Sequence, residues 1–229
     1  MSLELKTAFK NSIPVMMGYF VLGFALGLLM ASIGVPWYWV GVMSVLVYAG
    51  ALQFAAVGFL STHMSLPEIA IASFFINIRH AFYGLSLLKR YAQAGLAKLY
   101  LIHSLTDETY GVLTGMQVPE TVHFKRYALY LSALHQSYWI TGTIAGVLFG
   151  SSVHFDTRGL SFSLTALFVV LTIEQYKAHR RILPFVIGAV ASAVAWMLLG
   201  TNMLLGAIVI ALVMLFALRS QIERGTPDG

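Results

Sequence analysis

The sequence predicts an all-α fold, a polytopic integral membrane helical bundle with about 8 transmembrane segments (7–8). Hydrophobic residues make up 59% of the 229 residues and charged residues only 10%, whereas soluble domains carry about 25% charged residues. The mean hydropathy is +0.80, so the chain has too few polar side chains to cover a water-soluble globule. The apolar runs reach about 20 residues without alternation, which favours membrane-spanning helices over the strands of a membrane barrel.

The first half of the chain predicts four of these spans. They cover residues 13–32, 40–60, 68–88 and 99–116, the last being the least apolar. Residues 1–12 are polar and are expected to form a short interfacial helix ahead of the first span. Trp37, Tyr38 and Trp39 precede the second span as an aromatic belt of the kind found at membrane surfaces.

The second half of the chain predicts four more spans, at residues 128–150, 160–173, 182–200 and 203–218. Glycines recur at four-residue intervals in the first and fifth spans, namely Gly23 and Gly27, and Gly142, Gly146 and Gly150. This pattern has two interpretations. The glycines allow helices to pack closely, or they mark a weak internal repeat of the kind found in transporters.

The distribution of Lys and Arg predicts that both termini are cytoplasmic. With eight crossings, most basic residues fall on the cytoplasmic side: Lys6, Lys10, Lys125, Arg126, Lys177, Arg180, Arg181, Arg219 and Arg224. The opposite side holds Lys89, Arg90, Lys98 and Arg158. The basic connector at 89–98 departs from the rule, so a re-entrant or half-crossing element near it stays open.

No low-complexity linker divides the chain, so residues 1–229 are expected to form a single transmembrane domain. The absence of cysteine excludes disulfides and Cys-ligated metals. The net charge of +5 is explained by basic residues at the cytoplasmic ends of spans rather than by nucleic-acid binding. Neither H-E-x-x-H nor G-x-S-x-G occurs, so we expect no enzyme, no metal and no cofactor.

Polar and charged side chains interrupt the third and fourth spans. The candidates are Asn77, Arg79, His80 and Tyr83 in the third span, and Thr106, Asp107 and Glu108 in the fourth. In an antiparallel hairpin, Arg79 and the two carboxylates reach the same depth. A lone charge at mid-bilayer costs roughly 2.5–3.5 kcal/mol, so we expect Arg79 to pair with one carboxylate. Two interpretations stay open: a salt bridge that only holds the hairpin, and a polar cavity on a substrate or proton pathway.

Three further candidates, Tyr48, Gly50 and Gln53, lie in the second span. The Gln53 amide either faces a point where the helix unwinds or makes an interhelical hydrogen bond. His80 either relays protons, since histidine titrates near neutral pH, or only donates a hydrogen bond. In the fifth span, segment 135–139 is polar enough to line a cavity, although Tyr and Trp are also expected near a membrane face.

Three of these segments carry distinctive motifs. They read Tyr-Ala-Gly-Ala-Leu-Gln-Phe at 48–54, Asn-Ile-Arg-His-Ala-Phe-Tyr-Gly at 77–84 and Leu-Thr-Asp-Glu at 105–108. They resemble the signature stretches of the AzlC family, the large subunits of bacterial branched-chain amino acid exporters of the azaleucine-resistance and YgaZ type. Order and spacing agree over roughly residues 10–200. The chain departs from the family at Asn77, where relatives often carry Asp, which puts a proton- or cation-handling role of that position in doubt.

The resemblance implies a secondary exporter of branched-chain or related hydrophobic amino acids (Leu, Ile, Val and Met) across the cytoplasmic membrane of a prokaryote. It also implies a partner, a small hydrophobic AzlD-type membrane subunit. We expect Asp107 or Glu108 to bind the substrate ammonium group, and Arg79 or a broken-helix N-terminus to bind its carboxylate. Coupling to protons or to the substrate gradient stays open. The alternatives are a non-transporting scaffold or regulatory subunit with fully paired charges, and an intramembrane enzyme with a converging triad.

Overall fold

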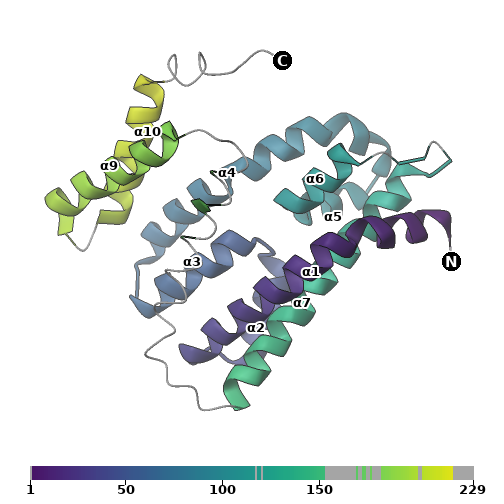
Figure 1. Ribbon diagram of the computed structural model, residues 1–229, viewed down its shortest axis with the longest axis horizontal. Helices are drawn as coiled ribbons and strands as arrows, with labels where there is room; N and C mark the ends of the chain where they lie inside the picture. Colours follow the sequence, from purple (N-terminus) through teal and green to yellow (C-terminus); the bar gives the residue numbers. More distant parts are fainter. Residues whose placement is uncertain are drawn as a thin grey trace. The chain divides into compact units, whose positions relative to one another are not determined.

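The computed structural model describes residues 2–116, 118–119, 121–152, 169, 172–173, 176, 182–200 and 203–218. All regular secondary structure in these residues is helical (Figure 1), which confirms the all-α prediction. The chain forms two compact units, Met1–Ser161 and Phe162–Gly229, and each is described by itself. The single domain expected over residues 1–229 stays a prediction.

Helices α1 (Leu3–Ser32) and α4 (Leu66–Tyr91) are long and apolar enough to cross a membrane. Helix α1 begins at Ser2, whose hydroxyl accepts a hydrogen bond from the backbone N–H of Leu5 at 3.3 Å, as a helix N-cap does. The separate interfacial helix predicted at residues 1–12 is therefore wrong. These residues form the first turns of α1, which continues without interruption through Pro14 into the first span.

The predicted second span, 40–60, is wrong as one continuous helix. The structure divides it into α2 (Trp37–Leu46) and α3 (Gly50–Ser61), which have 10 and 12 residues. Between them, Tyr48 has a φ angle of 40°, in the left-handed region that a bulky residue rarely adopts. Neither piece is long enough to cross a bilayer core of about 30 Å at about 1.5 Å per residue. The span consists of two half-helices.

The predicted fourth span, 99–116, is also wrong as one continuous helix. It consists of α5 (Ala97–His103) and α6 (Asp107–Gly115), which have 7 and 9 residues. They follow α4 after a short 3-10 turn at Ala92–Ala94. This pair of short helices follows the basic connector, and the re-entrant or half-crossing element left open there stays a prediction.

The sequence at the start of α6 explains this second break. The Thr106 hydroxyl accepts a hydrogen bond from the backbone N–H of Thr109 at 3.2 Å and so caps the helix. Asp107 and Glu108 occupy the first turn, where the helix dipole stabilises negative charge. Capping residue and acidic first turn together favour a new helix at Asp107 over continuation of α5.

Helix α7 (Phe124–Ser152) packs along α1 in the same direction (Figure 1). Both helices approach through glycine: a Cβ added to Gly142 would lie 2.7 Å from the carbonyl oxygen of Phe20. A Cβ on Gly146 would overlap the carbonyl oxygen of Phe24. The paired positions advance together along both chains, as expected for parallel helices. Close packing, the first interpretation of these glycines, is therefore confirmed, whereas the internal repeat stays a prediction.

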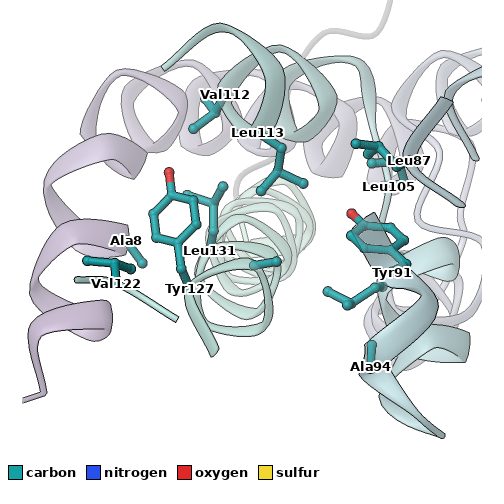
Figure 2. Close-up of a cluster of buried hydrophobic side chains, with 12 residues drawn as sticks. Ala8, Leu87, Tyr91, Ala94, Leu105, Val112, Leu113, Val122, Tyr127 and Leu131 are labelled. Atoms are coloured by element: carbon teal, nitrogen blue, oxygen red, sulfur yellow. The ribbon is translucent and has the colours of Figure 1, made fainter. Parts of the chain in front are cut away.

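A buried apolar cluster holds α5 and α6 against parts of α1, α4 and α7 (Figure 2). Its members are Ala8, Leu87, Tyr91, Ala94, Leu101, Leu105, Val112, Leu113, Val122, Tyr127, Ala128 and Leu131. Beside it, Nη1 of Arg90 donates to the carbonyl oxygen of Leu113 at 2.9 Å, and the guanidinium lies 4.0 Å from the ring centroid of Phe124. Arg90 thus satisfies a carbonyl near the C-terminus of α6, where helices leave carbonyls without intrahelical partners.

In the second unit, the structure describes α9 (Leu183–Leu199) and α10 (Met203–Ala217), which pack on each other. They coincide with the predicted seventh and eighth spans, so helices at these places are confirmed. The predicted sixth span, 160–173, lies outside the described residues except for helical positions 169 and 172–173. The number of spans and the side of each terminus stay predictions.

Candidate functional site

The break between α2 and α3 and the break between α5 and α6 both contact α7. The carbonyl oxygen of Val45, near the end of α2, accepts hydrogen bonds from Nε2 of His103 at 3.0 Å and from Nε2 of Gln136 at 3.2 Å. His103 ends α5, and the Tyr100 hydroxyl of the same helix donates to Oε1 of Gln136 at 2.8 Å. A helix end leaves carbonyls without partners, and the membrane interior offers no water to satisfy them. These side chains therefore hold the two breaks together.

A chain of hydroxyl groups runs from the second break into α7. The Tyr19 hydroxyl of α1 lies 2.6 Å from Oγ1 of Thr106 and 2.6 Å from Oε2 of Glu108. Thr106 donates to Oγ1 of Thr109 at 3.0 Å, and that oxygen lies 2.9 Å from Nδ1 of His135. His135 is fully buried, and its Nε2 has no hydrogen-bond partner among the described residues. The network therefore connects the Glu108 carboxylate to the imidazole ring of His135.

The predicted pairing of Arg79 with an acidic residue is confirmed, and the partner is Asp107. Nη1 of Arg79 lies 2.9 Å from Oδ2 of Asp107, with side-chain exposures of 38% and 35%. Nε of Arg79, Oδ1 of Asp107 and Oδ1 of Asn77 are buried atoms that have no partner among the described residues. The pair is therefore joined by one contact and keeps hydrogen-bonding capacity for another group.

His80 and Tyr83 lie near this ion pair on α4. The carbonyl oxygen of Asn77 is 3.2 Å from Nδ1 of His80, and it accepts the ring proton. The His80 ring meets Tyr83 edge-on at 5.8 Å between centroids, and Tyr83 stacks on Tyr110 at 4.6 Å. His80 therefore donates a hydrogen bond to its own helix and is not part of the hydroxyl chain, while its role as a proton relay stays a prediction.

Tyr48, Gly50 and Gln53 lie where the first break meets Trp139. Gln53 is fully buried; its Oε1 accepts from Nε1 of Trp139 at 2.8 Å, and its Nε2 donates to Oγ of Ser44 at 3.2 Å. A Cβ on Gly50 would lie 3.2 Å from the Trp139 ring. Tyr48 is buried, and its hydroxyl has no partner among the described residues. For Gln53 the interhelical interpretation holds, whereas the Tyr48 hydroxyl lies buried beside the first break without a geometrically defined partner among the described residues.

The two predicted acidic residues in the first turn of α6 contact different helices. Asp107 contacts Arg79 on α4, and Glu108 contacts Tyr19 on α1. The sequence-based site omits Tyr19 and includes His135 only as part of the polar segment 135–139, although both belong to the network around Glu108. A polar side chain in the middle of an apolar run is the signal that finds them, because ionisable groups inside a membrane are functional candidates by default.

Two other features of the described residues bear on the site. They include no cluster of three His, Cys, Asp or Glu side chains that could hold a metal ion. An apolar groove of about 480 Å³ lies between α2 and α7. It is lined by Trp37, Tyr38, Gly41, Val42, Val45, Leu46, Ile140 and Ile144. None of the predicted site residues lines it, although Val45, whose carbonyl oxygen joins the two breaks, does.

Comparison with known proteins adds a family. Residues 14–153 match the family model described as "AzlC protein", and this range includes both helix breaks and every predicted site residue. The chain is 38% identical over 219 residues to an "Uncharacterized membrane protein" of Helicobacter pylori, covering 95% of this chain and 96% of the relative. It is 33% identical over 220 residues to the "Branched-chain amino acid transport protein AzlC" of Bacillus subtilis, covering 96% and 87%.

A more distant relative is the "Inner membrane protein YgaZ" of Escherichia coli, which is 28% identical over 175 residues and covers 73% of this chain and 71% of its own length. No solved structure matches the chain. The similarity to the Helicobacter and Bacillus relatives extends over nearly the whole sequence, and therefore beyond the residues that the family model covers.

Proposed function

The chain belongs to the AzlC family, and from this premise we propose that it is a permease subunit that exports branched-chain or related hydrophobic amino acids by secondary transport. The family and its relatives establish a membrane protein with a role in transport. The observation that carries the proposal is the meeting of two broken helices beside Glu108. Many secondary transporters bind substrate at such breaks, where half-helix ends and unwound backbone are exposed.

Helices α3 and α6 are the second half-helices of the two broken spans, and their N-termini differ in charge. This difference suits a zwitterion. Helix α3 begins after Ala49 without a side-chain cap and without an acidic residue in its first turn. Its backbone N–H groups and the positive end of its dipole suit a carboxylate. Helix α6 begins with Asp107 and Glu108, which suit an ammonium group. Because Arg79 is already engaged by Asp107, the α3 N-terminus is the better of the two expected carboxylate partners.

Glu108 is the better of the two expected ammonium partners. Asp107 has a cationic partner, whereas within the described residues Glu108 contacts the neutral hydroxyl of Tyr19 and no cation. A carboxylate without a cation is costly inside a membrane, and a substrate ammonium group would supply the missing charge. Phe54, which is buried and lies 6.3 Å from Trp139 between ring centroids, offers an apolar wall to an aliphatic side chain.

The unpaired groups argue against the two alternatives. A scaffold or regulatory subunit is expected to pair its charges fully, yet Arg79 Nε and Asp107 Oδ1 have no partners within the described part of the chain. An intramembrane enzyme needs a nucleophile with its base or a metal, and the network around Glu108 contains hydroxyls bound to one another rather than such a triad. Transport therefore accounts for more of the observed chemistry.

The remaining parts of the proposal concern location and partner. We place the chain in the cytoplasmic membrane of a prokaryote, as a multi-pass protein with both termini cytoplasmic. We propose a small hydrophobic AzlD-type subunit as its partner. Helix α4 supports this, because Phe74 is 61% and Phe82 65% exposed, and lipid or a second apolar subunit is needed to cover such side chains.

The test is export of radiolabelled leucine from preloaded cells that lack other exporters, with and without the small subunit. We expect Glu108→Gln to lower the initial efflux rate by about 10-fold or more, since a charge-assisted contact to the ammonium group, worth about 1.5–3 kcal/mol, is lost. Glu4→Gln is the matched control, because it makes the same chemical change at the first turn of α1, away from both breaks.

Membrane levels must be equal in all variants, measured by quantitative immunoblot. Wild-type efflux in Glu108→Gln and in Asp107→Asn, at equal membrane levels, would remove both carboxylates from the mechanism and defeat the proposed site. Absence of leucine export by the wild type, with the small subunit present, would defeat the proposed function.

A further inference from the structure

His135 is an ionisable residue inside the bundle, and one of its ring nitrogens has no partner in the described part of the chain. Its side chain is fully buried, and its Nε2 has no hydrogen-bond partner among the described residues. Its Nδ1 lies 2.9 Å from the Thr109 hydroxyl, and Tyr19 packs edge-on against its ring at 5.9 Å between centroids. Buried polar groups are nearly always paired. A half-paired histidine at this place therefore calls for an explanation beyond packing.

The side chains between His135 and Glu108 form an unbroken chain. The contacts are 2.9 Å from His135 to Thr109, 3.0 Å from Thr109 to Thr106, 2.6 Å from Thr106 to Tyr19 and 2.6 Å from Tyr19 to Glu108. Each intermediate group is a hydroxyl, which both donates and accepts a hydrogen bond. Such a chain conducts a proton by successive transfers without moving any heavy atom far.

We infer that this chain is the proton path of the transporter, with Glu108 and His135 as its two proton-binding ends. The inference rests on the proposed transport function and adds the coupling ion. It names His135, and not His80, as the histidine that carries the proton. His80 donates to the Asn77 carbonyl of its own helix and has no contact with the hydroxyl chain.

One proton passes from Glu108 to His135 in four transfers. The protonated carboxyl of Glu108 gives its proton to the Tyr19 oxygen, Tyr19 gives its own to Thr106, Thr106 to Thr109, and Thr109 to Nδ1 of His135. Each of the hydroxyl oxygens of Tyr19, Thr106 and Thr109 loses one O–H bond and forms another, so the net change is the movement of one proton. The products are a Glu108 carboxylate and a His135 imidazolium that carries hydrogen on both nitrogens. Before the transfer, His135 is neutral with its hydrogen on Nε2, which leaves Nδ1 free to accept from Thr109.

Proton and substrate then compete for Glu108. An ammonium group binds Glu108 only when the carboxylate is ionised, so arrival of the amino acid drives the proton toward His135. Among the described residues, the titratable groups around the path include Tyr48 at the first break, Tyr83 on α4, Tyr100 and His103 on α5, and Asp107 on α6, which Arg79 of α4 neutralises. None of them interrupts the chain of hydroxyls, and exchange of one proton for one amino acid is the expected result.

Thr109 offers the sharpest test, because its hydroxyl can be removed with little change in shape. The full chain is reconstituted with its small subunit in proteoliposomes that contain a pH-sensitive dye. Thr109→Val removes the hydroxyl link, Thr109→Ser restores it, and Tyr19→Phe breaks the next link. Two quantities are measured: leucine counterflow, which needs no net proton movement, and proton flux evoked by leucine. Tyr91→Phe and His123→Gln are controls; Tyr91 has a buried hydroxyl without a partner in the described part of the chain, and His123 is exposed.

We expect Thr109→Val to keep leucine counterflow but to lower leucine-evoked proton flux by about 100-fold, within the range of a positioned proton-transfer group. Tyr19→Phe should lower the flux to a similar extent. Thr109→Ser and both controls should retain the flux. Undiminished flux in Thr109→Val and Tyr19→Phe would overturn the path while leaving transport intact. Equal loss of counterflow and flux in folded Thr109→Val would also overturn it, since the hydroxyl would then serve substrate binding. Absence of wild-type counterflow would instead defeat the proposed function.

Discussion

The glycine contact between α1 and α7 gives the most direct test of the fold, through Gly146→Ala. A Cβ at position 146 would lie 2.8 Å from the Cα and the carbonyl carbon of Phe24. Carbon atoms pack best at about 3.5–4.0 Å, so the helices must separate by about 1 Å. The obstructing atoms belong to the backbone, and no side chain can rotate out of the way.

The expected loss of stability follows from two opposing effects. Overpacking costs about 1–3 kcal/mol, and the backbone obstruction places this case near about 3 kcal/mol. Alanine regains about 1 kcal/mol over glycine in helix propensity, which leaves a net loss of about 2 kcal/mol. For a chain of this size, that loss lowers Tm by roughly 4–8 °C.

The assay is thermal unfolding of detergent-purified protein, followed by size-exclusion fluorescence. Gly18→Ala is the matched control, since it makes the same change in α1 at a position where an added Cβ meets no atom within 4 Å. We expect its Tm to equal or exceed that of the wild type. A Gly146→Ala protein that melts together with Gly18→Ala would refute the close backbone contact between α1 and α7.

Three further predictions concern paired side chains. Arg79→Ala leaves Asp107 without its cation at a cost of up to about 2.5–3.5 kcal/mol, reduced because each side chain is about one-third exposed. We expect a lower membrane level by immunoblot, and we expect Asp107→Asn in the same chain to restore it. Failure of that rescue would contradict a pairing role. Arg90→Lys loses the planar contact with Phe124 and the aligned bond to the Leu113 carbonyl; we expect a stability loss of about 1–2 kcal/mol in the same thermal assay, and an unchanged Tm would show that neither contact matters. Gln53→Leu leaves the buried Nε1–H of Trp139 without its acceptor; we expect a loss of about 1–3 kcal/mol, and equal stability would mean that another group accepts this bond.

The apolar pattern predicts the helical class and the approximate places of the helices. The charged residues within that pattern predict the pairing of Arg79 with a carboxylate. These features follow from local composition and from the cost of a lone charge in a membrane. The glycines also predict close helix contact, although the sequence does not identify α7 as the partner of α1. That identity depends on which backbone fits Gly27 and Gly146, and the fit exists only in three dimensions.

The breaks in the second and fourth spans are not predictable from the apolar pattern. Neither break contains a proline, and the residues around Tyr48 are small and apolar in both directions. The breaks are stable because distant side chains replace the lost backbone bonds, as Gln136 and His103 do at the Val45 carbonyl. Only for α6 is there a local signal, the Thr106 cap followed by two acidic residues, and a sequence interpretation that favours continuous spans passes over it.

The contrast between the helix pairs suggests which parts move during transport. Helices α1 and α7 touch backbone to backbone through Gly142 and Gly146, and contacts of this kind resist sliding because the packed surfaces interlock. The breaks are held by single side-chain hydrogen bonds, each worth about 0.5–1.5 kcal/mol net, which can be exchanged for bonds to a substrate. Tyr19 and His135 belong to the interlocked pair, whereas Glu108 belongs to a half-helix. Movement of α6 would therefore carry Glu108 away from Tyr19 and disconnect the proton path. The substrate held by Glu108 would then be separated from the proton held by His135, and each would be released without the other on one side of the membrane.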